Sequence, residues 1–94
     1  MIKVMIQRRV PKELIDPYQQ AASKIMLKAM QSPGFISGES LRNADDEEDR
    51  VVFANYRSEG DWSRWYHSAE RRAMIEALRP MLEGDEKITV LEHI

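Results

Sequence analysis

The chain has 94 residues, enough for one domain, and no cysteine, which excludes disulfides, thiol catalysis and thiolate metal sites. Its net charge of −2, with 43% hydrophobic and 32% charged residues, is typical of a folded globular protein and argues against nucleic acid as a partner. Apolar runs are far shorter than the roughly 20 residues of a membrane span, and a signal peptide's apolar core is missing, so we expect a single cytoplasmic domain over residues 1–94 with no membrane partner.

The first predicted element is a strand over residues 2–10, where the side chains alternate between two faces. Arg8 stands on the otherwise apolar face of this strand, and Pro11 ends it. The apolar residues of that face are Ile2, Val4, Ile6 and Val10.

A helix is predicted next, with Asp16 as its N-cap and Pro17 at its first position, where the missing N–H costs nothing. Leu14 and Ile15 are candidates for a preceding turn of the same helix. Apolar residues at three- and four-residue steps predict one buried stripe along the helix. The stripe consists of Tyr18, Ala21, Ala22, Ile25, Met26, Ala29 and Met30.

Two strands are predicted in the middle of the chain, over residues 35–42 and 51–57, after a helix-ending SPG at residues 32–34. An acidic run at residues 45–49 lies between them. Because like charges repel one another and stay solvated, we expect this run to be a connector rather than a cation site. The alternating ligands and central glycine of a calcium loop are absent from it.

A helix is expected to open at the stretch EGDWSRWYHS, because Ser58 and Asp61 resemble a capping box. Ser68 is a second possible N-cap, so we expect the segment to bend there. The longer helix that follows weakens at Pro80 and ends at Gly84. Its predicted apolar face contains Ala73, Met74, Ala77, Leu78, Met81 and Leu82.

The last predicted element is a strand over residues 87–94, which completes the order β-α-β-β-α-β. This order is typical of the ferredoxin-like α+β fold, in which two helices cover one face of an antiparallel sheet. The other face of the sheet is left open, and so short a chain buries little surface by itself. We therefore expect the open face to pair with a second copy of the chain.

With this order in place, the chain resembles the antibiotic biosynthesis monooxygenase (ABM) domains of the dimeric α+β barrel group. The resemblance rests on SPGF at residues 32–35, on NYRS at residues 55–58, and on Trp62-x-x-Trp65-x-x-Ser68-x-x-Arg71. It implies a homodimer with a cavity in each subunit, between the helices and the sheet. It also implies oxidation of a quinol or a polycyclic phenol by O₂ without metal or flavin.

A branch of the same fold binds and degrades haem, and Trp65 stands where that branch has a tryptophan. The branch's haem-ligating histidine falls near Ile75, and its first-strand asparagine falls at Arg8, or at Gln7 if the register slips. Two of three signature positions disagree, so the resemblance disfavours haem and implies no cofactor. His67 and His93 also lack zinc-ligand spacing, so no metal site is expected.

The resemblance places a small aromatic ligand in a flat slot lined by the aromatic residues Tyr18, Trp62, Trp65 and Tyr66. His67 is the candidate base, because it alone in mid-chain has an ordinary pKa near neutrality. Arg8 and Asn55 are candidates to hold a phenolate oxygen.

Less specific interpretations of the same residues stay open. The tryptophans also suit core packing, His67 also suits a solvent-facing position, and Arg8 also suits a simple ion pair. Many quinol-oxidising relatives have a histidine where Trp65 stands, and indole does not titrate. A non-catalytic dimeric domain that binds or senses a ligand is therefore the alternative function.

Overall fold

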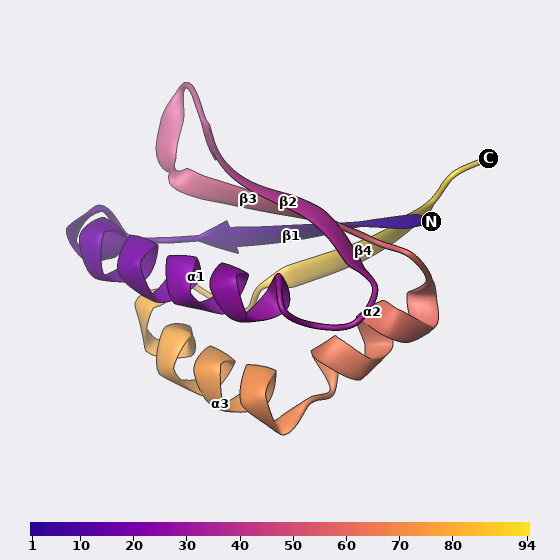
Figure 1. The fold of residues 1–94 in the computed structure, drawn as a ribbon. Helices are drawn as coiled ribbons and strands as arrows, with labels where there is room; N and C mark the ends of the chain where they lie inside the picture. Colours follow the sequence, from indigo (N-terminus) through magenta and orange to yellow (C-terminus); the bar gives the residue numbers. More distant parts are fainter.

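The computed structural model describes residues 1–94 as a four-stranded antiparallel sheet with helices on one face (Figure 1). The strands are β1 (Ile2–Arg9), β2 (Phe35–Asn43), β3 (Asp46–Tyr56) and β4 (Lys87–Glu92), in the sheet order β2-β3-β1-β4. The helices are α1 (Ile15–Ala29), α2 (Glu59–Tyr66) and α3 (Ala69–Leu78), with the short 3₁₀ helices η1 (Lys12–Leu14) and η2 (Arg79–Met81). None of them combines the length and the apolar character needed to cross a membrane. The ferredoxin-like α+β fold is confirmed.

The central strand β1 divides the sheet into an inner and an outer face, as its alternating sequence predicts. Val4 and Ile6 are buried on the inner face, toward the helices, while Met5 and Gln7 are partly exposed on the outer face. Ile6 lies opposite Val52 of β3 and Ile88 of β4. The inner faces of three strands thus meet α1 and α3 in one apolar core.

Helix α1 begins earlier than the sequence predicts, and Asp16 is not its N-cap. The turn η1 runs directly into the helix, so Leu14 occupies the N-cap position and donates its backbone N–H to the Pro11 carbonyl. Pro17 is tolerated because the first four N–H groups of a helix have no intrahelical partner. In the predicted stripe Tyr18, Ile25 and Ala29 are buried and the other helical members are partly buried, but Met30 follows the last helical residue and is exposed.

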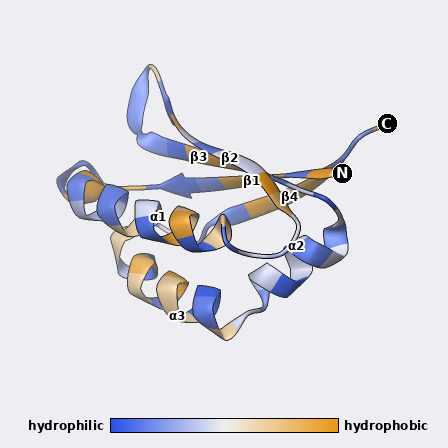
Figure 2. Ribbon diagram, in the orientation of Figure 1, coloured by the Kyte–Doolittle hydropathy of each residue, from blue (hydrophilic) through white to orange (hydrophobic).

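The acidic run is part of a strand rather than a connector. Only Ala44 and Asp45 form the turn, and β3 begins at Asp46. The guanidinium of Arg9 donates to Asp46 at 3.0 Å and to Glu48 at 3.2 Å, which relieves the repulsion expected in this run. The same hydrogen bond lowers the pKa of Asp46 below its ordinary value. The hairpin is mostly hydrophilic around its tip (Figure 2).

Both predicted caps in the second half of the chain are present. The Ser58 hydroxyl accepts a hydrogen bond from the backbone N–H of Asp61, and the Ser68 hydroxyl accepts one from the N–H of Arg71, each at 3.1 Å. The second cap starts a new helix at Ala69, so the chain bends between α2 and α3 (Figure 1). The bend at Ser68 is confirmed.

The buried face of α3 differs from the predicted one. Arg71, Ile75 and Leu78 point into the core, whereas Ala73 and Ala77 are exposed. The prediction follows the apolar residues and treats an arginine as solvent-facing. The structure instead buries Arg71 against a carboxylate, which rotates the helix relative to that expectation.

Two glycines with positive φ offer a matched test of the turn at residues 32–35. Gly34 has φ +83° and Gly84 has φ +86°, but a Cβ at Gly34 would collide with the side chain of Asp61, and one at Gly84 would meet nothing. We expect Gly84→Ala to lower the free energy of unfolding by about 1 kcal/mol, from backbone strain alone. Gly34→Ala should lower it by about 3 kcal/mol, because overpacking adds to the strain. Equal losses in urea denaturation would contradict this account of the turn.

Candidate functional site

A small cavity lies between α1, α2 and the inner face of the sheet. Its volume is about 30 Å³, close to the share of one water molecule in the liquid, so it does not hold an aromatic ring in this conformation. Most of its walls are apolar, and two arginines are the only charged residues in them. We call this space the inner cavity; it is lined by Ile6, Arg8, Ala22, Ile25, Met26, Ala29, Ser40, Val52, Ala54, Tyr56, Trp62, Trp65 and Arg71.

The two arginines of the inner cavity share a single carboxylate. Arg8 Nε donates to Glu86 Oε1 and Arg71 Nη2 donates to Glu86 Oε2, both at 3.0 Å. The side chains of Arg8, Arg71 and Glu86 are only 3%, 4% and 13% exposed. Neither guanidinium has a second carboxylate within ion-pair distance, so this cluster carries a net positive charge in a largely dry environment.

Arg71 also has an unused donor. Its Nε is buried and has no hydrogen-bond partner. The guanidinium carbon lies 5.7 Å from the ring centre of Trp62 and 5.0 Å from that of Tyr66, so both aromatic rings contribute cation–π contacts. An unpaired donor on a buried cation can donate to one more acceptor, preferably a negatively charged oxygen.

An aromatic cluster supports the α2 side of the cavity. Tyr56 packs edge-on against Phe35 at 5.5 Å and against Trp62 at 5.7 Å between ring centres, and Trp62 lies 5.6 Å from Tyr66. The Tyr56 hydroxyl is 2.8 Å from Ser32 Oγ. Burial raises the pKa of Tyr56, although the hydrogen bond with Ser32 acts in the opposite direction. Tyr56 is therefore a neutral structural residue of the wall rather than a base.

Four of the predicted site residues are brought together. Trp62, Trp65 and Arg8 line the inner cavity, and the Tyr18 hydroxyl accepts a hydrogen bond from Arg8 Nη1 at 3.2 Å. Tyr66 is 39% exposed and lies behind Trp62, outside the cavity. The tryptophans are thus core residues and cavity walls at once.

Two predicted site residues lie elsewhere. His67 follows the last residue of α2, is exposed, and has its Nδ1 2.9 Å from the Ser63 carbonyl. Asn55 points to the outer face of the sheet and donates to Ser37 Oγ at 3.0 Å. Neither lines the inner cavity.

Sequence reasoning missed Arg71 and Glu86 as site residues. Arg71 is the last residue of the family-like pattern that begins at Trp62. A charged residue in line with aromatic residues is a signal of the same kind as a charged residue on the apolar face of the first strand, which marks Arg8. Glu86 gives no such signal, because it sits among other polar residues before β4. Its importance depends on the tertiary fold alone.

Haem does not fit these residues. No histidine lines the inner cavity, and its volume of about 30 Å³ is far below that of a porphyrin. His67 has one ring nitrogen engaged with the backbone and faces solvent. No three His, Asp or Glu side chains are grouped as a metal site either.

Comparison with known proteins identifies relatives of this fold. The family model for antibiotic biosynthesis monooxygenases matches residues 1–77. No curated protein has a significant sequence match to the chain. Among solved structures, the cofactor-independent oxygenase SnoaB from Streptomyces nogalater superposes with a TM-score of 0.87 at 14% identity, covering 98% of this chain and 91% of its own.

Two further structures agree on the fold. Rv0793 from Mycobacterium tuberculosis has a TM-score of 0.88 at 16% identity, covering 99% of this chain and 94% of its own. A protein from Deinococcus radiodurans has a TM-score of 0.91 at 16% identity, covering 99% and 92%. At these identities the superpositions establish the shared fold and nothing about the chemistry.

The shared carboxylate leads to a stability prediction. Glu86→Gln leaves two buried guanidiniums without a counter-charge, so we expect a loss of about 3 kcal/mol in the free energy of unfolding, measured by urea denaturation at neutral pH. The control is Glu83→Gln, because Glu83 is exposed and its carboxylate lies as far as 4.0 Å from Arg9 Nε. We expect this variant to lose less than about 0.5 kcal/mol in the free energy of unfolding. A neutral effect of Glu86→Gln would show that the arginine pair is stable without its acid.

Proposed function

The chain belongs to the antibiotic biosynthesis monooxygenase family, and from this premise we propose that it is a cofactor-independent monooxygenase of a phenol or quinol. The observation that carries the proposal is the inner cavity itself. It joins aromatic walls from Trp62 and Trp65 to two arginines that share one carboxylate. Apolar walls with excess positive charge suit an aromatic ring that carries a negative oxygen, once the cavity has widened to admit the ring.

The chemistry needs no external reductant. A phenolate ring carbon donates electrons to O₂ and forms a C–O bond, which gives a ring hydroperoxide. Loss of water from that carbon breaks the O–O and C–H bonds and leaves a carbonyl. The substrate gains one oxygen and loses two hydrogens, and the second atom of O₂ leaves as water. SnoaB, of the same fold, is a cofactor-independent oxygenase, which supports this class of reaction.

Charge stabilisation takes the place of a base in this proposal. The Arg71 Nε donor and the Arg8 guanidinium favour the ionised phenol over the neutral one. His67 and Asn55 lie outside the cavity, so we assign them no contact with the reacting ring. The phenolic proton passes to solvent as the ligand binds.

The inner cavity must widen to admit a ring. A benzene-sized molecule needs a cavity of about 150 Å³, against the present volume of about 30 Å³. Met26 of α1 lines the cavity, and its three rotatable bonds make it the wall residue that moves most easily. We assign it the role of a movable wall.

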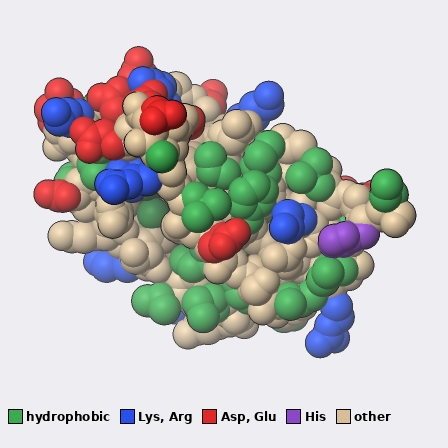
Figure 3. Space-filling model, turned by 90° about the horizontal axis from the view of Figure 1, so that it is seen from above, with side chains coloured by type: hydrophobic (Ala, Val, Ile, Leu, Met, Phe, Trp, Pro, Cys, Tyr) green, Lys and Arg blue, Asp and Glu red, His purple; other side chains and the backbone are tan.

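We propose further that the chain forms a homodimer through the outer face of the sheet. Figure 3 looks onto this face and shows hydrophobic side chains gathered over its middle, with acidic side chains at one corner. Lys3 lies over the ring of Phe53, 5.4 Å from its centre. Such an apolar sheet face is suited to a matching face on a second copy. Its apolar residues are Met5, Leu41, Val51, Phe53 and Leu91.

A non-catalytic ligand-binding domain is the second candidate. It is favoured by the lack of any cavity-lining side chain that ordinarily titrates near neutrality. Ligand-dependent increases in melting temperature without O₂ consumption would support it over the monooxygenase.

Oxygen uptake tests the proposed activity. With 1-naphthol and 1,4-dihydroxynaphthalene as substrates, we expect Arg71→Gln to lower kcat/KM about 100-fold, because it removes a preorganised donor to the phenolate oxygen. His67→Gln should stay within about twofold of the parent protein, since His67 lies outside the cavity. Rates are corrected for spontaneous oxidation in buffer. A larger loss in His67→Gln than in Arg71→Gln would reverse the assignment.

Light scattering tests the dimer. We expect the parent chain to have twice its 11.0 kDa mass at micromolar concentration. Phe53→Glu should weaken association by at least about 100-fold, because it buries an unpaired charge at the interface. Leu27→Glu is the matched control, since Leu27 is exposed on α1. A parent monomer, or equal effects of the two variants, would rule out this interface.

A further inference from the structure

Three arginines form a row across the inner face of the sheet. Arg8 of β1 lies directly opposite Arg50 of β3, which lies directly opposite Arg42 of β2. Like charges placed opposite one another on neighbouring strands destabilise a sheet. Glu86 pairs with Arg8 at one end of this row, but no ion pair joins a carboxylate to Arg42 or Arg50.

The two outer members of the row line a groove between α1 and the β2–β3 hairpin. This outer groove has a volume of about 370 Å³. Its helix wall includes Gln19 and Ser23, and its sheet wall includes Ser40 with Arg42 and Arg50. None of its eight lining residues is Asp or Glu. The groove is therefore open, polar and positively charged.

The nearby acidic residues do not neutralise the groove. Asp46 and Glu48 pair with Arg9, and the Glu47 carboxylate is 3.9 Å from Lys12 Nζ. Arg50 donates only to uncharged oxygens, at 2.8 Å to the Glu47 backbone carbonyl and at 3.3 Å to Gln19 Oε1. Both guanidiniums keep their full charge available for an anion.

The outer groove adjoins the inner cavity. Ala22 and Ser40 line both spaces, and Tyr18 of the groove is hydrogen-bonded to Arg8 of the cavity. A ligand that spans them would meet Arg42 and Arg50 with one end and the tryptophan walls with the other.

We propose that the outer groove binds a carboxylate on the ligand, held by Arg42 and Arg50, while the hydroxylated ring of the same ligand enters the inner cavity. The planar fork of each guanidinium matches a carboxylate. The inference rests on the proposed function only in taking this ligand to be the substrate. It specifies the substrate class as hydroxyarene carboxylates rather than neutral phenols.

A matched pair of probes tests the groove by isothermal titration calorimetry. We expect 1-hydroxy-2-naphthoate to bind at least about tenfold more tightly than 1-hydroxy-2-naphthamide, because only the acid gains charge-assisted contacts. The preference should shrink at high salt, as for other exposed charges. The double variant Arg42→Gln, Arg50→Gln should bind acid and amide equally.

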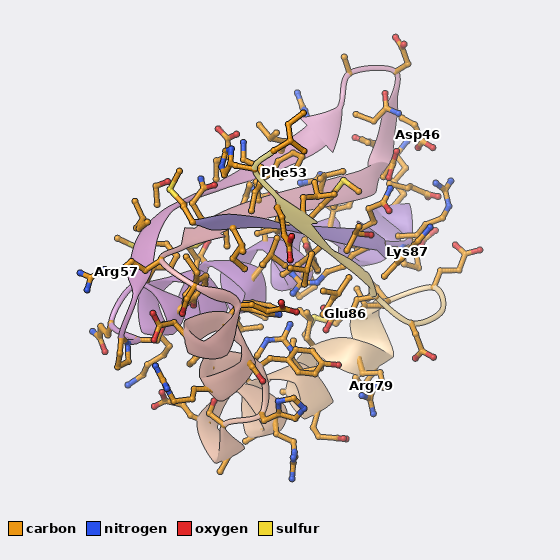
Figure 4. The ribbon with its side chains drawn as sticks, turned by 90° about the vertical axis from the view of Figure 1, so that its right-hand side faces the viewer. Asp46, Phe53, Arg57, Arg79, Glu86 and Lys87 are labelled. Carbon is orange, nitrogen blue, oxygen red and sulfur yellow. The ribbon has the colours of Figure 1, made fainter.

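The control is Arg57→Gln, Arg72→Gln, which changes the net charge by the same amount outside the groove. Both of its residues are exposed and without ion pairs, and Arg57 extends away from the body of the protein (Figure 4). It should keep the preference for the acid. We expect all variants to fold, because Arg42 is exposed and Arg50 is partly exposed. Circular dichroism checks this.

Three results would overturn the inference: equal binding of acid and amide by the parent protein, no binding of either, or a preference that survives in the groove variant. Its failure is separable from that of the proposed activity. If the groove variant loses the preference for the acid and the parent protein takes up no O₂, the carboxylate site is supported and the monooxygenase activity is rejected. If the parent protein turns over 1-naphthol but binds acid and amide equally, the activity is supported and the carboxylate site is rejected.

Discussion

Glu86 supplies the one negative charge against which two arginines are buried. Arg8 belongs to the central strand and Arg71 to α3, so their shared carboxylate connects the sheet, the helix layer and the segment before β4. Figure 4 shows Glu86 and Phe53 on opposite sides of the sheet, which places this ion pair on the helix side and the outer apolar face away from it. Removing an ion from such a cluster leaves a buried charge uncompensated, which is far more costly than losing an exposed pair. The carboxylate thus holds in place an arginine that points inward from α3, contacts Trp62 and lines the inner cavity.

Local signals were sufficient for most of the fold. The alternation of β1, the caps at Ser58 and Ser68 and the turn at Gly34 each depend on residues within a few positions of one another, so sequence alone predicts them. The orientation of α3 does not have this property. Its inward residue is an arginine whose partner lies in another element, and a helical pattern read from apolar residues turns such a residue outward. The prediction of a connector at the acidic run is wrong for the same reason, because Arg9 of a different strand compensates the charge of the run.

In the site, too, local patterns predict some residues, and others depend on contacts between distant elements. Arg8 is predictable because it is the one charged residue on an apolar strand face, and the structure gives it a buried, paired position. Arg71 belongs to the pattern that begins at Trp62, but the pattern itself predicts no role for it. Residue type alone favours His67 as a base, and the direction of its side chain excludes it from the cavity. Successive residues of a helix differ in direction by about 100°, so position 67 faces away from the side of α2 on which Trp62 and Trp65 lie.

Excess positive charge is the property that unites the inner cavity and the outer groove. In the free protein this charge lowers the stability of the fold. The residues Arg8, Arg50 and Arg42 repel one another across the strands, and Arg71 keeps an unpaired donor. In the proposed function a bound anion relieves both, so the same charges that lower stability without ligand would favour binding of an acidic aromatic molecule. This also accounts for a non-titrating tryptophan at position 65. Where the protein stabilises the ionised substrate directly, the site needs a flat wall beside the ring more than it needs a second base.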